Sequence, residues 1–178
     1  MIIRNETKAD HRAVEELTRR AFYNLYVPGC VEHYLAHVMR EHEDFIPELD
    51  FVAELDGKII GNIMYTKARL VEHSFEQAVR LGYDVIVIFG SPANYVARGF
   101  KSCKRYGVCS EDGRFPAAMM VKELVPGVLD GRRRTYHGSP VMEVSEAEAE
   151  RYDGNFDFME KKYRPSQEEF FIMSQAFL

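Results

Sequence analysis

Two histidines about one helical turn apart are the first side chains whose types and spacing could do chemistry. His33 and His37 stand at positions i and i+4, with Cys30 and Glu41 about a turn to either side. Residues four apart share one face of a helix, so these side chains could converge on a metal ion such as zinc. No HExxH motif accompanies them, and the alternative is a solvated helix surface. We expect the solvated surface and no metal site.

Three cysteines, Cys30, Cys103 and Cys109, form an odd set without CxxC spacing. This pattern favours reduced thiols over a disulfide framework. Cys103 and Cys109 could be redox partners, but the alternative, which we expect, is that they are inert small apolar residues.

One basic run, Arg132, Arg133 and Arg134, follows an Asp-Gly turn. It could bind an anion. The alternative is a solvated loop, which we expect because three charges in an acidic protein make no extended patch.

Composition limits the function classes. The chain has 178 residues, of which 46% are hydrophobic, and this suits one domain with a real core. A net charge of -5 argues against a nucleic-acid partner. The apolar runs are far shorter than the roughly 20 residues that span a bilayer, and charged residues interrupt the start where a signal peptide would stand. We therefore expect a soluble cytoplasmic protein without a membrane partner.

The elements that must position these side chains follow from periodicity and turn residues. Asp56-Gly57 between two strand-like runs predicts a hairpin, and the nearly continuous apolar run before Gly90 predicts a central strand covered on both faces. The expected order is a strand (1–6), two amphipathic helices (10–23 and 30–43), the hairpin (51–71), a helix (73–82), the central strand (83–90), a short helix (91–100), a strand pair (101–108 and 117–124) and two terminal helices (145–153 and 166–177). The fold class is α+β, with a mixed sheet flanked by helices.

This order over residues 1–125 resembles the GNAT superfamily of acetyl-CoA-dependent N-acetyltransferases. The most specific stretch is "GYDVIVIFGSPANYVARGFK", residues 82–101, which looks like the family's fifth strand, fourth helix and the turn before the sixth strand. "IIRNETKADHRAVEELTRRAF" and "FVAELDGKIIGNIMYT" are similar to its opening strand and helix and to its second and third strands. The resemblance implies a GNAT-like domain at 1–125 and a C-terminal extension at 126–178 packed on the same domain.

One part of the family pattern is missing. Members carry a fourth strand and then an Arg/Gln-x-x-Gly-x-Gly/Ala turn, whose N–H groups bind the pyrophosphate of CoA. Here no glycine lies between Gly61 and Gly82, so the lost segment would fall between Arg69 and Glu72. The sheet could re-pair with its remaining strands, a second chain could supply the missing edge in a homodimer, or the sequence could lack a natural segment.

The resemblance also implies site residues. Tyr95, four residues before Gly99, matches a family tyrosine near the leaving thiolate, where a phenol could protonate the sulfur. The alternative is a half-buried ring whose hydroxyl bonds within the protein. Ser91 and Asn94 could contact the pantetheine arm of acetyl-CoA, with helix capping as the alternative. Glu54 is a candidate general base by position alone, with a solvent-facing carboxylate as the alternative.

Two functions follow. The first is an N-acetyltransferase that moves acetyl from acetyl-CoA to an unidentified small-molecule or peptide amine, where the basic run could take the 3′-phosphate of CoA. The second is a catalytically inactive GNAT-like binding or relic protein. The tail contains Phe170, Phe171, Met173 and Phe177, which would give a helix a broad apolar side. We expect that side to pack on its own domain, or else on a dimer partner.

Overall fold

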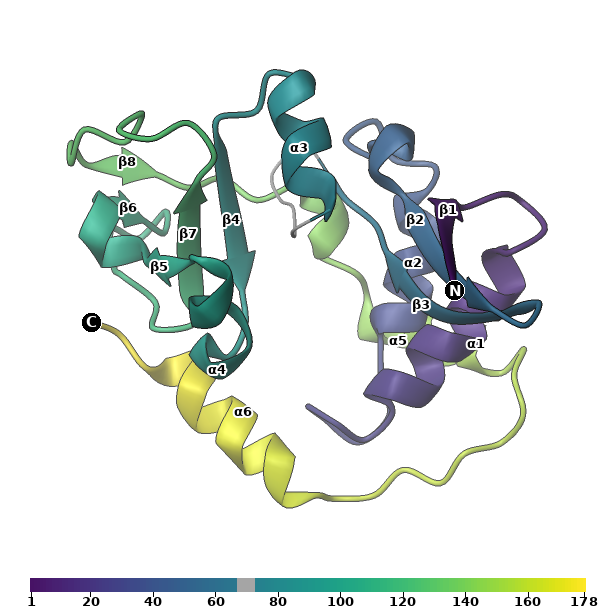
Figure 1. Cartoon of the computed structure of the whole chain (residues 1–178). Helices are drawn as coiled ribbons and strands as arrows, with labels where there is room; N and C mark the ends of the chain where they lie inside the picture. The colour runs from purple at the N-terminus through teal and green to yellow at the C-terminus, as the bar shows by residue number, and fades with distance from the viewer. Residues whose placement is uncertain (67–72) are drawn as a thin grey trace. The chain divides into compact units, whose positions relative to one another are not determined.

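A computed structural model describes residues 1–66 and 73–178, and the chain in it forms two compact units (Figure 1). The described residues of the first unit are 1–66 and 139–169, and those of the second are 73–138 and 170–178. The α+β class is confirmed, because antiparallel sheets and helices build both units. The division into a domain at 1–125 and an extension at 126–178 stays a prediction.

The first unit contains a three-stranded antiparallel sheet in the order β1-β2-β3. Its strands are β1 (Ile2–Asn5), β2 (Phe51–Leu55) and β3 (Lys58–Ile63). The predicted hairpin is confirmed, since Asp56 and Gly57 join β2 to β3 with φ angles of 50° and 74°. Two successive positive φ angles are typical of a two-residue turn whose twist matches that of the strands.

Three helices complete the first unit, namely α1 (His11–Phe22), α2 (Glu32–Met39) and α5 (Glu146–Asp153), together with the 3-10 helices Pro47–Leu49 and Pro140–Met142. The predicted cap of α5 is confirmed, because the Ser145 hydroxyl accepts a hydrogen bond from the Glu148 N–H. Helix α1 packs against α2 and β3. Val14, Leu49 and Val52 are fully buried and mark the core of this unit.

The second unit contains the antiparallel sheet β4-β7-β5 and the parallel pair β6-β8. The strands are β4 (Val85–Phe89), β5 (Lys101–Ser102), β6 (Val108–Cys109), β7 (Met119–Glu123) and β8 (Arg134–Thr135). The predicted strand pair is confirmed by the pairing of β5 with β7. The predicted central position of β4 is wrong for the described residues, in which β7 is central and β4 pairs with β7 alone.

Helices α3 (His73–Arg80) and α4 (Pro92–Tyr95) and the 3-10 helices Val96–Arg98 and Cys103–Tyr106 complete the central part of the second unit. Gly82 has a φ of 85° and donates its N–H to the Val79 carbonyl, so it ends the α3 region as predicted. One core cluster of this unit comprises Val87, Cys103, Val108, Met119 and Val121.

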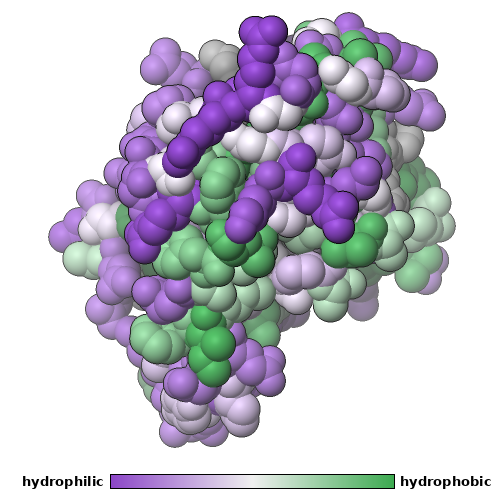
Figure 2. Space-filling model, turned by 90° about the vertical axis from the view of Figure 1, so that its left-hand side faces the viewer, coloured by the Kyte–Doolittle hydropathy of each residue, from purple (hydrophilic) through white to green (hydrophobic). Residues whose placement is uncertain are grey.

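The last helix, α6 (Pro165–Gln175), differs from its prediction in two ways. The helix begins one residue before Ser166, whose hydroxyl donates to the Leu25 carbonyl and caps nothing. The predicted apolar side is only partly buried, because Phe170 and Met173 are partly buried whereas Phe171 is 60% and Phe177 is 41% exposed. Figure 2 shows green apolar patches interrupted by purple polar side chains on the face that it presents.

None of the helices in the described part of the chain is long and apolar enough to cross a membrane.

Candidate active site

The candidate site lies where β4 passes into α4, in the second unit. The Gly90 N–H donates to the Ala118 carbonyl and ends the strand pairing, and Ser91 is extended with φ -65° and ψ 128°. Pro92 opens the helix, where its missing N–H costs nothing and its fixed φ suits the first turn. Gly99 ends the following turn in the left-handed conformation with φ 86°. These local rules place residues 91–95 immediately after the strand.

Tyr95 is held by its ring and not by its hydroxyl. The ring meets the Phe100 ring edge to face, with centroids 5.8 Å apart and planes at 72°. It also lies against Gly90, where a Cβ would come within 2.6 Å of the Tyr95 Cε2 atom. The Tyr95 ring therefore packs within the protein, as the alternative interpretation expected. The hydrogen bond that the same interpretation expected is missing, because the Tyr95 hydroxyl makes no hydrogen bond to any residue that the structure describes.

Ser91 and Asn94 leave their side chains available as well. Ser91 has the backbone position of a cap, but its hydroxyl makes no capping hydrogen bond, so the capping alternative is wrong for this residue. Asn94 is exposed, and its backbone donates to the Ser91 carbonyl at 3.0 Å and accepts from the Arg98 guanidinium. Contact of these side chains with a pantetheine arm stays a prediction.

Lys122 is a neighbour of this site that the sequence did not indicate. The pairing of β7 with β5 brings its Nζ within 2.7 Å of the Arg98 carbonyl, to which it donates. The same ammonium lies 3.8 Å from the centroid of the Phe75 ring and 5.9 Å from that of Phe100. Lys122 therefore shares Phe100 with Tyr95 and puts a positive charge at the turn that follows α4. No local pattern in the sequence predicts this contact.

A binding site for the phosphate groups of CoA is not found among the described residues. The predicted deletion between Arg69 and Glu72 lies outside the described residues, and α3 is described from His73 onward. The sequence contains no G-x-G pair anywhere, so the family's N–H cradle for pyrophosphate has no counterpart of the same type. A role of the β4–α4 connection at the thioester end of acetyl-CoA stays a prediction.

Glu54, the candidate base, is engaged elsewhere. Its carboxylate lies 2.9 Å from Arg4 in an ion pair, and its side chain is 26% exposed. Arg4 also donates to both oxygens of Asp10, and hydrogen bonds with Asp10 and Glu54 raise the pKa of Arg4. Glu54 is thus neither a free base nor a fully solvated carboxylate.

A polar cluster of the first unit contains one of the two histidines. His33 is fully buried, so the predicted solvated surface is wrong for it. Its Nδ1 lies 3.3 Å from Cys30 Sγ and its Nε2 lies 3.3 Å from the Asp153 Oδ1. Arg19 donates to both oxygens of Asp153, at 2.5 and 3.0 Å. Burial lowers the pKa of His33 and raises that of Cys30 to about 12, so thiol and imidazole are neutral at pH 7. A neutral thiol beside a carboxylate already paired with Arg19 is a poor nucleophile.

His37 belongs to a second cluster. Its Nδ1 lies 3.2 Å from the Glu15 Oε1, which also accepts a hydrogen bond from Arg40 at 2.7 Å. The other carboxylate oxygen, Oε2, accepts from the Tyr152 hydroxyl at 2.9 Å. Burial, and next the hydrogen bond with Glu15, raises the pKa of Tyr152. The two histidines therefore lie beside different carboxylates, although both rings contact the Tyr152 ring. The described residues hold no group of three or more His, Cys, Asp or Glu side chains placed for a metal ion.

The basic run and the other cysteines fit structural roles. Asp130 pairs with Arg132 at 2.9 Å and with Arg134 at 3.0 Å. Cys103 and Cys109 are buried, and the Cys109 thiol lies 3.4 Å from the Arg134 carbonyl. Two of the three positive charges are thus compensated within their own loop.

The fold of the chain was compared with those of known proteins. No protein-family model and no curated protein sequence matches the chain. Among solved structures, the chain is similar to a GNAT family N-acetyltransferase, YhbS from Escherichia coli, crystallised in complex with CoA. The TM-score is 0.60 at 24% sequence identity, and the match covers 76% of this chain and 89% of that one. The predicted GNAT-like fold is therefore confirmed, and this chain has the fold of a GNAT family N-acetyltransferase.

Proposed function

We propose that this protein is an N-acetyltransferase that transfers the acetyl group of acetyl-CoA to an amine. The observation that carries the proposal is a GNAT-like fold in which the β4–α4 connection presents a Tyr95 hydroxyl without a hydrogen bond to the described residues. The similar enzyme was crystallised with CoA, which supports acetyl-CoA as the co-substrate.

In this proposal, the acceptor amine attacks the thioester carbonyl, a C–N bond forms and the C–S bond breaks. Tyr95 donates its phenolic proton to the departing sulfur, so that CoA leaves as a thiol. Ser91 and Asn94 bind the polar groups of the pantetheine arm and orient the thioester. Glu54 is already paired with Arg4, so we assign no base among the side chains. The amine proton passes to water, and the Tyr95 phenolate regains a proton from water.

The second candidate is a GNAT-like protein that binds a ligand without catalysis. The specific observation in its favour is the absence of any glycine between Gly61 and Gly82, where the family's pyrophosphate turn would stand. Loss of that turn would remove several charge-assisted hydrogen bonds, each of which typically contributes about 1.5 to 3 kcal/mol.

Calorimetric titration with acetyl-CoA, combined with an acetyl-transfer assay on a panel of primary amines, separates the two candidates. Tyr95→Phe should lower kcat by about 100-fold or more and leave the Kd for acetyl-CoA within about two-fold, because only the proton donor is lost. Tyr163→Phe is the matched control, since Tyr163 is 68% exposed and lies outside this site. Absence of binding up to about 1 mM acetyl-CoA would refute the enzyme and favour the binding protein.

A further inference from the structure

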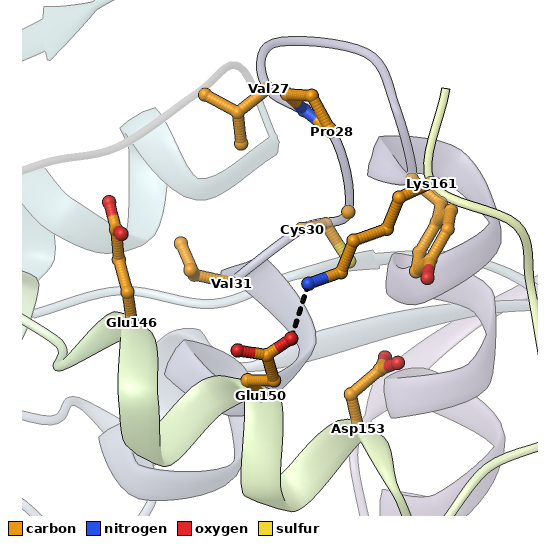
Figure 3. Close-up of a pocket in the computed structure, with 10 residues that line it drawn as sticks. Val27, Pro28, Cys30, Val31, Glu146, Glu150, Asp153 and Lys161 are labelled. Carbon is orange, nitrogen blue, oxygen red and sulfur yellow. Dashed lines mark hydrogen bonds and ion pairs between the residues drawn. The ribbon is translucent and has the colours of Figure 1, made fainter. Parts of the chain in front are cut away.

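A pocket of about 460 Å³ opens in the first unit between α5 and the loop that joins α1 to α2 (Figure 3). Val27, Pro28 and Val31 of the loop give it an apolar wall. Glu146 and Glu150 project from the same side of α5 toward it. None of these residues belongs to the β4–α4 connection.

The buried Asn24 fixes the chain on both sides of this pocket. Its side-chain oxygen accepts from the N–H groups of Gly29 and Lys162, at 2.9 and 3.0 Å, and its Nδ2 donates to the Glu160 carbonyl at 2.9 Å. The residues before and after Lys161 are therefore held against the loop. The backbone of Lys161 stays in place whichever way its side chain points.

The Lys161 side chain lines the pocket and reaches across it toward α5. Its methylene stem passes over Gly29, where a Cβ would come within 3.2 Å of the Lys161 Cε. Its ammonium lies 2.5 Å from the Glu150 carboxylate, as the dashed line in Figure 3 marks. The pocket thus already holds an aliphatic chain that ends in an ammonium group, with the chain on the loop and the charge on α5.

This occupant is weakly held, and the pocket keeps one uncompensated charge. Lys161 is 49% and Glu150 69% exposed, and ion pairs of this kind contribute little because water screens them. Asp153, deeper in the pocket, is neutralised by Arg19. Glu146 has no ion-pair or hydrogen-bond partner among the residues that the structure describes.

We propose that this pocket binds an aliphatic diamine, and that Lys161 is an intramolecular occupant which the ligand displaces. One ammonium of the ligand takes the position of the Lys161 ammonium on Glu150, and its methylene chain lies on the apolar loop. The second ammonium pairs with Glu146. Lys161 rotates into solvent without any movement of the backbone.

Helix geometry sets the length of the ligand. Glu146 and Glu150 are four residues apart on α5, which separates them by about 6 Å along the helix axis. The nitrogens of 1,4-diaminobutane are about 6 Å apart when its chain is extended, so a four-carbon diamine matches this spacing. An anionic ligand would meet Glu146 and Glu150 as like charges, and a monoamine would leave Glu146 unpaired.

Calorimetric titration of the full chain with 1,4-diaminobutane at low salt tests the proposal. Lys161→Ala should tighten binding about three- to six-fold, because it removes a competitor held by an exposed ion pair. Lys162→Ala is the matched control, since Lys162 pairs with Glu160 and does not line the pocket. That control should leave the affinity unchanged.

Substitutions of Glu150 and Glu146 should affect ligand binding in different ways. Glu150→Gln should weaken binding of the diamine and of n-butylamine by about five-fold or more. Glu146→Gln should weaken only the diamine and abolish its advantage over n-butylamine. Glu160→Gln removes the same charge outside the pocket and should change neither affinity. All of these side chains are exposed, so the variants should keep the unfolding midpoint of the wild type.

Absence of binding to Lys161→Ala at about 10 mM diamine would overturn the proposal, as would equal affinities in Glu150→Gln and Glu160→Gln. The binding claim needs no acetyl-CoA and is independent of the proposed function. Only the further step, that the diamine is the acetyl acceptor, rests on that function. If the diamine binds and is not acetylated, only the step that makes it the acceptor fails. If the diamine binds and no amine of the panel is acetylated, the proposed function fails and the pocket stands. Acetylation of other amines without diamine binding would overturn the pocket and leave the proposed function standing.

Discussion

Replacement of Asp50 by asparagine should change how the stability of the first unit depends on pH. Asp50 is 5% exposed and accepts a hydrogen bond from the Asn62 amide at 3.1 Å. Its other neighbour is Glu6, whose fully buried carboxylate pairs with Arg40 at 2.7 Å. Burial, and next the hydrogen bond with Glu6, raises the pKa of Asp50 to about 8. Asp50 therefore keeps its proton at pH 7 and donates it to Glu6.

The sign of the effect follows from proton binding. Unfolded Asp50 loses its proton near pH 4, whereas folded Asp50 holds it up to about pH 8. The contribution of the protonated pair to stability is complete below pH 4 and is lost as the pH rises toward 8. One proton corresponds to about 1.4 kcal/mol per pH unit. Between pH 5 and 7, the wild type should lose about 2 to 3 kcal/mol relative to Asp50→Asn, which stays neutral and can still donate to Glu6.

The assay must report on the first unit alone. The chain contains no tryptophan, so we would follow unfolding in urea at pH 5, 6 and 7 by hydrogen exchange of peptides from β1 and β2. Asp56→Asn is the matched control, because Asp56 is an exposed turn residue of the same sheet. A constant difference between wild type and Asp50→Asn across this pH range would refute the reasoning, since it would mean that Asp50 is already ionised in the folded protein.

Three other substitutions or reactions test separate parts of the structure. Arg19→Leu leaves the Asp153 carboxylate without its two hydrogen bonds, so it should cost about 3 kcal/mol in urea unfolding, and a cost below about 1 kcal/mol would contradict a structural ion pair. Gly90→Ala places a Cβ 2.6 Å from the Tyr95 ring, so it should cost about 1 to 3 kcal/mol and shift the Tyr95 ring signals in NMR spectra; unshifted signals would exclude the close packing. Cys30, with a pKa of about 12, should react with iodoacetamide at pH 8 at least about 100-fold more slowly than free cysteine, and peptide mass mapping that finds equal rates would show that the thiol is not shielded.

Features that depend on a few neighbouring residues were predictable from the sequence. The Asp56-Gly57 hairpin, the Gly82 helix end and the Ser145 cap all follow from backbone sterics or from a hydrogen bond within one turn. The same applies to the β4–α4 connection, because Pro92 and Gly99 set its start and its end. This connection was the most specific stretch of the sequence resemblance, and the comparison with a solved structure confirms the predicted GNAT-like fold.

Pairing between distant elements was not predictable in this way. The apolar run of β4 is compatible with a central strand and with an edge strand. The hydrophobic pattern of a strand does not determine which strands pair with it. In the described residues, β7 takes the centre and brings Lys122 to the turn after α4. The partly exposed apolar side of α6 is a similar case, since an apolar pattern shows that a side could be buried but does not supply the surface that buries it.

The sequence by itself determined the turns, the helix ends and the short connection that carries Tyr95, since each depends on interactions within a few residues. Only the tertiary structure decided the surroundings of the ionisable groups. His33 meets Asp153 although 120 positions separate them, and Glu6 meets Asp50 across 44 positions. The pKa of a group depends on its burial and on the charges around it, and both are set by chain segments that only folding brings together. The diamine pocket has the same origin, because its carboxylates lie on α5 and its apolar wall lies on a loop more than 100 residues earlier.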